Sequence, residues 1–169
     1  LRDMALAYAQ SGITSFAPTL RAKPLQDYIP YLEAYRKAYG DDYKGARYVG
    51  AHLEGPYLNP EQAGNMDASL FQKINIQELD QFLNQYHKDI AVMTIAPELE
   101  NASEAIYLLH LYGIEVSLGH TSATFEQCQA AFMEGASQIT HLCNSMPFLD
   151  HHERNMMDAI LLSDCICTI

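Results

Sequence analysis

The sequence has few positive charges. Its 10 lysine and arginine residues stand against 21 aspartates and glutamates, which gives a formal net charge of −11. This balance disfavours binding to nucleic acid and to anionic membrane surfaces. The sequence also lacks a run of about twenty apolar residues and any segment that resembles a signal peptide. We therefore expect no nucleic-acid partner, no membrane partner and a cytoplasmic location.

The cysteines lack the CxxC spacing that is typical of many zinc and redox motifs. None lies beside a recognisable base at a turn, so no cysteine is a strong nucleophile candidate. We expect buried free thiols in a reduced compartment. The four positions are Cys128, Cys143, Cys165 and Cys167, and the last two fall on one face of an expected strand.

Apolar residues make up 49% of the 169 residues, enough for the core of one domain. Strand-like and helix-like segments alternate, which favours βαβ units and a parallel sheet. We expect strands at 13–17, 47–53, 91–96, 114–118, 138–142 and 165–169. We expect helices at 2–10, 24–39, 77–87, 101–112, 124–134 and 155–163, and a surface turn at 40–42.

Three lone polar residues mark the ends of apolar strands. Glu54 follows an apolar run and precedes Gly55-Pro56, while His120 and His141 end two later strands. In a parallel sheet these ends share one edge, where ligands bind. Each residue alone has an ordinary structural explanation, but together a carboxylate and two imidazoles suit a zinc-type ion with an open position.

Polar residues beside these three have plainer roles. His52 faces the same side of the strand as Glu54, and we expect it to hydrogen-bond within the site rather than to ligate. Thr121 and Ser122 are expected to cap the following helix. The loop at 151–154 is interpreted either as a solvated loop or as an anion-binding segment.

Five strings in the sequence resemble one family. They are GITSF at 12–16, HLEGPYL at 52–58, APE at 96–98, GHT at 119–121 and THLCNSM at 140–146. Their order and spacing are similar to those of the N-acetylglucosamine-6-phosphate deacetylases, in the amidohydrolase superfamily. The set spans essentially the whole chain, and it is specific only in combination.

This resemblance implies an α/β fold of the (β/α)8 TIM-barrel type. Residues 1–169 would form the central part of one barrel, about strands two to seven. It implies Glu54, His120 and His141 as ligands of a divalent metal, most simply zinc, with iron, manganese or cobalt as alternatives. The metal would activate water for attack on the acetamide of N-acetylglucosamine 6-phosphate, giving glucosamine 6-phosphate and acetate.

The family's catalytic aspartate lies on the last barrel strand, which the resemblance places beyond Ile169. No catalytic residue is therefore assigned within the chain, and Asp150, Asp158 and Asp164 are poor replacements by position. The chain starts on an expected helix and stops in an expected strand. We interpret it as an internal piece of a longer polypeptide or as an ordered portion of one.

The resemblance also indicates substrate contacts. Asn144 and Ser145 take the place of the Asn-Ala pair whose loop contacts the sugar phosphate, and Asn65 and Met66 take that of another sugar-contacting pair. His152 stands where the family has a phosphate-binding arginine. Arg154, two residues later, is one alternative. The other is a partner subunit, because the resemblance also implies a homodimer.

Two other functions stay open at this point. One is a related amidohydrolase that acts on another N-acetyl sugar or a cyclic amide, which the changed residues Met66 and His152 favour. The other is a non-catalytic, truncated relative, which the missing aspartate favours.

Overall fold

The fold is organised around a six-stranded sheet in which every neighbouring pair of strands is parallel. The computed structural model describes residues 1–39 and 44–168, so the turn expected at 40–42 lies outside the described residues. The spatial order of the strands follows the chain: β2 (Thr19–Arg21), β4 (Ala51–Glu54), β5 (Ile90–Ile95), β6 (Glu115–Leu118), β7 (Ala136–Ile139) and β8 (Ile166–Cys167).

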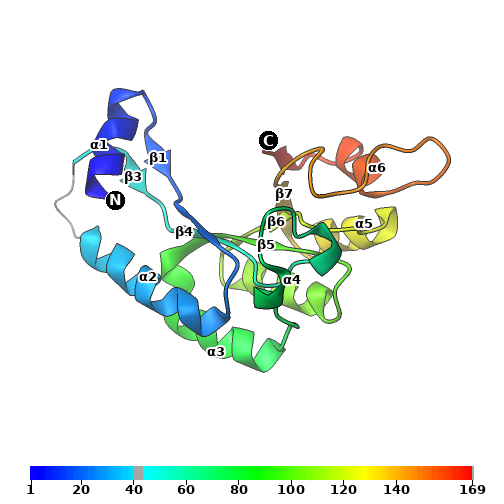
Figure 1. Ribbon diagram of the computed structural model, residues 1–169, viewed down its shortest axis with the longest axis horizontal. Helices are drawn as coiled ribbons and strands as arrows, with labels where there is room; N and C mark the ends of the chain where they lie inside the picture. The colour runs from blue at the N-terminus through cyan, green and yellow to red at the C-terminus, as the bar shows by residue number, and fades with distance from the viewer. Residues whose placement is uncertain (40–43, 169) are drawn as a thin grey trace.

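The helices that follow the strands pack side by side in the same order. They are α2 (Leu25–Ala38), α3 (Ile76–Tyr86), α4 (Ala102–Leu111), α5 (Phe125–Met133) and α6 (Met156–Leu161). Each contacts the next, and Figure 1 shows α2 and α3 running beneath the sheet. A parallel sheet with its helices in sequence order is an arc of a (β/α) barrel. The predicted α/β class is confirmed.

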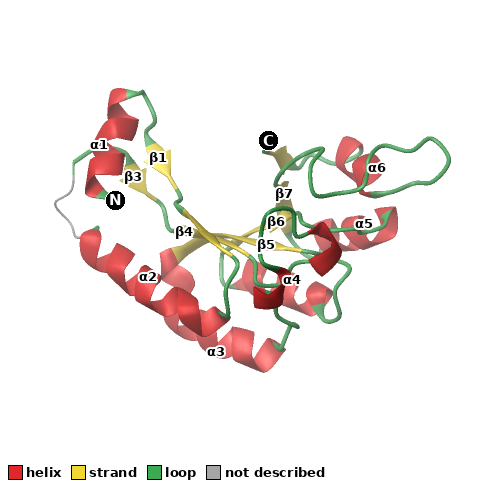
Figure 2. Cartoon of the chain, in the orientation of Figure 1, coloured by secondary structure: helices red, strands yellow, loops and turns green. Residues whose placement is uncertain are grey.

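The first strand pair is broken, which the sequence did not predict. The expected strand at 13–17 is β1 (Ser15–Phe16), which pairs with β3 (Arg47–Tyr48) in a separate two-stranded sheet. The six-stranded sheet begins only beyond Pro18, with β2, and the expected strand at 47–53 is split at Val49 and Gly50. Figure 2 shows this small sheet beside α1 (Arg2–Gln10) at one end of the molecule.

Between β4 and β5 the chain forms, besides α3, three short 3-10 helices: η1 (Pro60–Gln62), η2 (Ala68–Leu70) and η3 (His87–Asp89). Near the other end, β7 stops at Ile139, so the strand expected at 138–142 is displaced by two to three residues. Among the described helices, none is long and apolar enough to cross a membrane.

The core lies between the sheet and its row of helices. Apolar side chains from the strands pack against apolar side chains from the helices, as expected for parallel strands covered by helices. The side chains include Leu53, Met93, Ile95, Val116, Leu118 and Ile139 from strands, and Leu79, Leu83, Ile106, Leu109, Cys128 and Ala131 from helices. This packing fixes the sheet and so fixes where its carboxyl edge lies.

The prediction of buried cysteines is correct for one residue in four. All four thiols, which lie in the described part of the chain, are free, and Cys128 on α5 is buried. Cys143, on the loop after β7, and Cys167, on β8, are exposed in the described part of the chain. The Sγ atoms of Cys165 and Cys167 are 3.8 Å apart, as the shared strand face requires.

Alkylation of the native protein with iodoacetamide is expected to modify Cys143 and to spare Cys128. Burial raises the pKa of the Cys128 thiol to about 12, so little reactive thiolate forms. The buried side chain is also inaccessible to the reagent. Peptide mass spectrometry with and without denaturant measures this. Rapid modification of Cys128 in the native protein would contradict the packing of α5 against the sheet.

Candidate metal centre

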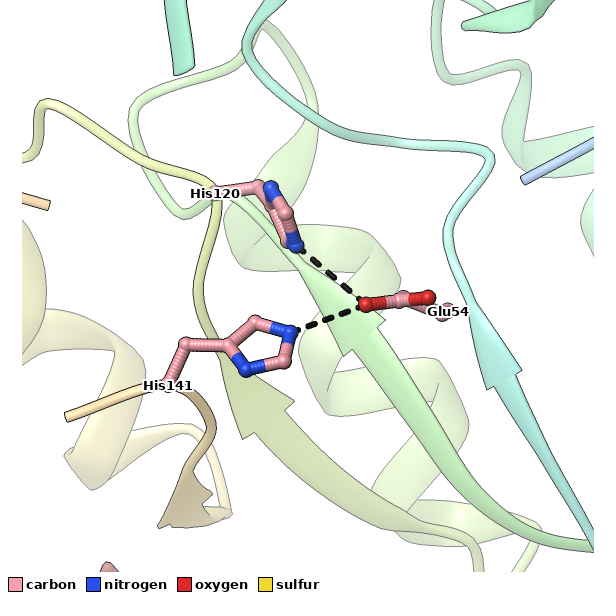
Figure 3. A group of neighbouring side chains, drawn as sticks. All are labelled: Glu54, His120 and His141. Carbon is pink, nitrogen blue, oxygen red and sulfur yellow. Dashed lines mark hydrogen bonds and ion pairs between the residues drawn. The ribbon is translucent and has the colours of Figure 1, made fainter. Parts of the chain in front are cut away.

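Glu54, His120 and His141 converge at the carboxyl edge of the sheet. Glu54 is the last residue of β4, and each histidine lies two residues beyond its strand, β6 or β7. On a flat sheet, the backbones of β4 and β7 would lie about 14 Å apart. The side chains nevertheless point toward one another from their separate strands, as Figure 3 shows.

The three side chains offer ligand atoms at close range. Glu54 Oε1 lies 2.9 Å from His141 Nε2 and 3.3 Å from His120 Nε2. One ligand atom from each residue lies within 4.8 Å of the others, the spacing of donors that share a single ion. Two imidazole nitrogens and one carboxylate oxygen are a donor set that zinc accepts. The residues present therefore fit a divalent metal.

Both histidines adopt a left-handed backbone conformation, which the sequence did not indicate. The φ angle is 51° at His120 and 58° at His141, and Cys143 and Ser145 also have positive φ. Such conformations cost of order 1–3 kcal/mol for a residue other than glycine and cluster at functional sites. They turn the chain sharply after β6 and β7, which carries both imidazoles back over the strand ends.

The imidazole of His120 is held in one orientation. Its Nδ1 lies 2.8 Å from the carbonyl oxygen of Gln62, so Nδ1 carries the proton and donates to that oxygen. Nε2 then faces Glu54, to which it can donate a proton, and it offers its lone pair to an ion only when it carries no proton. His120 is the more enclosed histidine, with a side chain 6% exposed against 37% for His141. His141 is therefore the more accessible of the two candidate ligands.

The Glu54 carboxyl is ionised despite its burial. Burial raises its pKa, but the hydrogen bonds and positive charge of His120 and His141 outweigh burial and lower the pKa to about 2. A carboxylate held in this state is ready to bind a cation.

His52 makes hydrogen bonds and is not one of the three candidate ligands, as expected, but its partners lie outside the three-residue group. Its ring bridges two threonines, with Nδ1 3.1 Å from Thr19 Oγ1 and Nε2 2.7 Å from Thr94 Oγ1. Burial lowers its pKa, although the charge of Glu54 opposes this. His52 thus ties β4 to both neighbouring strands beneath the site.

Thr121 and Ser122 do not cap the next helix, because Thr124 does so. They bind Glu98 instead, whose carboxylate accepts hydrogen bonds from the Thr121 hydroxyl and from the Ser122 backbone N–H. Sequence reasoning placed Glu98 in a motif but gave it no role. Its position just after β5, between the strands of Glu54 and His120, could have indicated one.

Two of the expected substrate-contacting segments lie beside the candidate ligands. A Cβ atom built on Gly64 would be 3.2 Å from Ser145 Oγ and 3.9 Å from His120 Cε1, so the 64–66 segment borders the group. The Ser145 carbonyl accepts from Thr121 N–H at 3.2 Å. Asn144 and Met66 flank these positions in the chain, the former exposed and the latter half-buried.

Asn65 has a partner that sequence reasoning missed. Arg21 Nη2 donates to both the carbonyl and the Oδ1 of Asn65, at 2.9 and 2.8 Å. Arg21 ends β2 in register with Glu54, and paired residues of neighbouring strands point to the same face. The sequence analysis did not indicate Arg21, because it did not predict β2, the strand beyond Pro18.

His152 and Arg154 lie on the exposed loop before α6. The His152 N–H donates to Asp150, its ring lies 3.9 Å from that of His151, and the Arg154 guanidinium lies over the Phe125 ring. These contacts do not include the candidate ligands. The structure brings Ser145 and the 64–66 segment to the group and leaves His152 on a separate loop.

The fold and the site together define a class: an arc of a parallel (β/α) barrel with a Glu-His-His group at its carboxyl edge that fits a divalent metal. No protein-family model matches the chain. It is 35% identical over 159 residues to N-acetylgalactosamine-6-phosphate deacetylase of Escherichia coli O157:H7, covering 94% of this chain and 42% of the relative. It is 33% identical over 162 residues to N-acetylglucosamine-6-phosphate deacetylase of Vibrio furnissii, covering 96% and 41%.

Solved structures show the same likeness. N-acetylglucosamine-6-phosphate deacetylase from Thermotoga maritima superposes with a TM-score of 0.85 at 29% identity, covering 97% of this chain and 44% of that one. A mutant of the Mycobacterium smegmatis enzyme in complex with N-acetyl-D-glucosamine-6-phosphate gives 0.79 at 28%, covering 91% and 40%. In sequence and in fold the chain corresponds to about two fifths of the N-acetylglucosamine-6-phosphate deacetylases. This confirms the resemblance inferred from the motifs.

Proposed function

We propose that the protein is a metal-dependent hydrolase that removes acetate from N-acetylglucosamine 6-phosphate, and that residues 1–169 form the central part of its barrel. The observation that carries this proposal is the convergence of Glu54, His120 and His141 within a segment that matches the deacetylases. Zinc is the metal we expect from the donor set, with iron, manganese and cobalt as alternatives.

In this proposal the chain's residues hold the metal and one face of the substrate. Glu54 supplies the only anionic ligand of the three, and Gln62 keeps the His120 Nε2 lone pair available. When bound, a divalent cation lowers the pKa of water and polarises a carbonyl oxygen, which is what amide hydrolysis needs. From the resemblance to the deacetylases, we place proton transfer on an aspartate beyond Ile169.

We place the sugar phosphate over the 64–66 segment and Ser145, with Asn144 beside them. Arg21 adds a positive charge there, whereas His152 or Arg154 would need their loop to reach the ligand. We further propose a cytoplasmic homodimer, in which a partner subunit completes the phosphate site.

Acetate release is expected to be at least about 100-fold faster, as kcat/KM, from N-acetylglucosamine 6-phosphate than from unphosphorylated N-acetylglucosamine. Loss of charged hydrogen bonds to a phosphate removes about 2–3 kcal/mol, which is roughly a 100-fold change. The assay uses the purified zinc-loaded protein with an enzymatic acetate readout. Comparable rates on both sugars would contradict a phosphate-specific site.

A second candidate substrate is N-acetylgalactosamine 6-phosphate, because one of the relatives carries that name. The two sugars differ only in configuration at C4, so the same assay with both compounds separates them. No acetate from either, with retained binding of both, would favour the non-catalytic alternative.

A further inference from the structure

The conformation of His120 is imposed by a turn far away in the sequence. His120 has a φ of 51°, which its own backbone disfavours. Its carbonyl oxygen accepts the Asn59 N–H at 3.0 Å, and its ring Nδ1 donates to the Gln62 carbonyl at 2.8 Å. The main chain and the ring of His120 are therefore both fixed by the segment around η1.

The same segment is fastened to the residues after His120 by one carboxylate. Glu98 Oε1 accepts the Asn59 Nδ2–H at 2.9 Å and the Ser122 N–H at 2.7 Å. Its Oε2 accepts the hydroxyl of Thr121, which is fully buried. Glu98 thus joins the turn that holds His120 to the two residues that follow His120 in the chain.

We infer that Glu98 is a positioning residue of the metal centre, which holds the His120 imidazole where its Nε2 can share an ion with Glu54. This inference rests on the proposed metal site. Glu98 lies outside the three-ligand group and acts through His120.

The chemistry of the network requires a carboxylate. Three donors from two segments point at Glu98, and an ionised carboxylate accepts all of them without presenting a donor of its own. Hydrogen bonds to a charged acceptor are also the stronger kind. A glutamine would keep one oxygen for Asn59 and Ser122, but it would lose the charge and set its N–H₂ against the Thr121 hydroxyl, which would have to accept instead of donate. Alanine would remove all three of these hydrogen bonds and leave the turn joined to Ser122 through the Gln62 side chain, whose Nε2 donates to Ser122 Oγ at 2.9 Å.

Zinc affinity of the metal-free protein tests the inference, measured by competition with a fluorescent chelator. Glu98→Ala is expected to weaken zinc binding by roughly 10–100-fold, as the loss of a partner outside the ligand set does. Glu98→Gln is expected to lose less. The matched control is Glu115→Ala, since Glu115 also accepts a serine hydroxyl but opens β6 at the opposite edge of the sheet. It is expected to stay within about twofold of the unchanged protein.

The thermal midpoint, with and without zinc, separates positioning from simple stability. We expect the midpoint of the metal-free Glu98 variants to stay near that of Glu115→Ala, while their gain on adding zinc becomes smaller. Glu98→Gln decides the matter if the alanine variant fails to fold. Zinc binding by either Glu98 variant as tight as that of the control would overturn the inference alone. Absence of zinc binding by the unchanged protein would overturn the proposed metal site, and this inference with it.

Discussion

Replacing Glu54 with glutamine is expected to remove zinc from the protein. The substitution keeps the shape of the side chain but removes the only anionic ligand of the three. The amide also presents N–H₂ to the imidazole nitrogens that now lie 2.9 and 3.3 Å from Oε1. We expect zinc affinity to fall by more than the roughly 10–100-fold that loss of an outer partner costs. Metal analysis after dialysis against a weak chelator measures it.

The matched control for this prediction is Glu61→Gln. Glu61 lies on η1, next to Gln62, and its side chain is exposed. Its replacement therefore changes the net charge by the same amount without removing a candidate ligand. We expect its zinc content to equal that of the unchanged protein. If Glu54→Gln retains the same zinc content as this control, Glu54 is not a ligand and the proposed function loses its central observation.

Glu54, His120 and His141 could be found from the sequence because burial of a lone polar residue at the end of an apolar strand requires a partner. Alternation of strands and helices then predicted that the three strand ends share one edge. The sequence could not give the distances, because these depend on the left-handed turns at His120 and His141. The turn at His120 is held by Asn59 and Gln62 from another segment, so it leaves no local pattern in the sequence.

The errors have a common origin in long-range contacts. Thr121 was expected to cap a helix because that is the usual local role of threonine, yet its hydroxyl binds Glu98 from another strand end. His52 was expected to hydrogen-bond within the site without a named partner, and its partners are threonines of β2 and β5. Arg21 was missed because Pro18 was taken to end the strand, whereas the chain resumes an extended path immediately after it.

The break at Gly50 is the feature of the first strand pair with the largest expected effect on stability. Gly50 has a φ of +121° and carries the chain from the small β1–β3 sheet into β4. A Cβ atom built there would lie 2.6 Å from the backbone nitrogen of Ala91 and 3.0 Å from its Cβ. The neighbouring atom belongs to the main chain of β5, so it cannot rotate away as a flexible side chain would.

Gly50→Ala is therefore expected to lower the free energy of unfolding by about 3 kcal/mol or more, measured by urea denaturation. The control is Gly12→Ala, because Gly12 also has a positive φ, of +83°, but no atom lies within 4 Å of its Cβ position. The control keeps the conformational strain alone, which costs about 1–2 kcal/mol. The difference between the two variants measures the clash with β5.

Because β4 ends on Glu54 only four residues later, a shift that relieves the clash moves the carboxylate, and zinc affinity should fall in Gly50→Ala but not in Gly12→Ala. Equal destabilisation of both variants would show that β5 yields at this point and that the break does not set the position of Glu54.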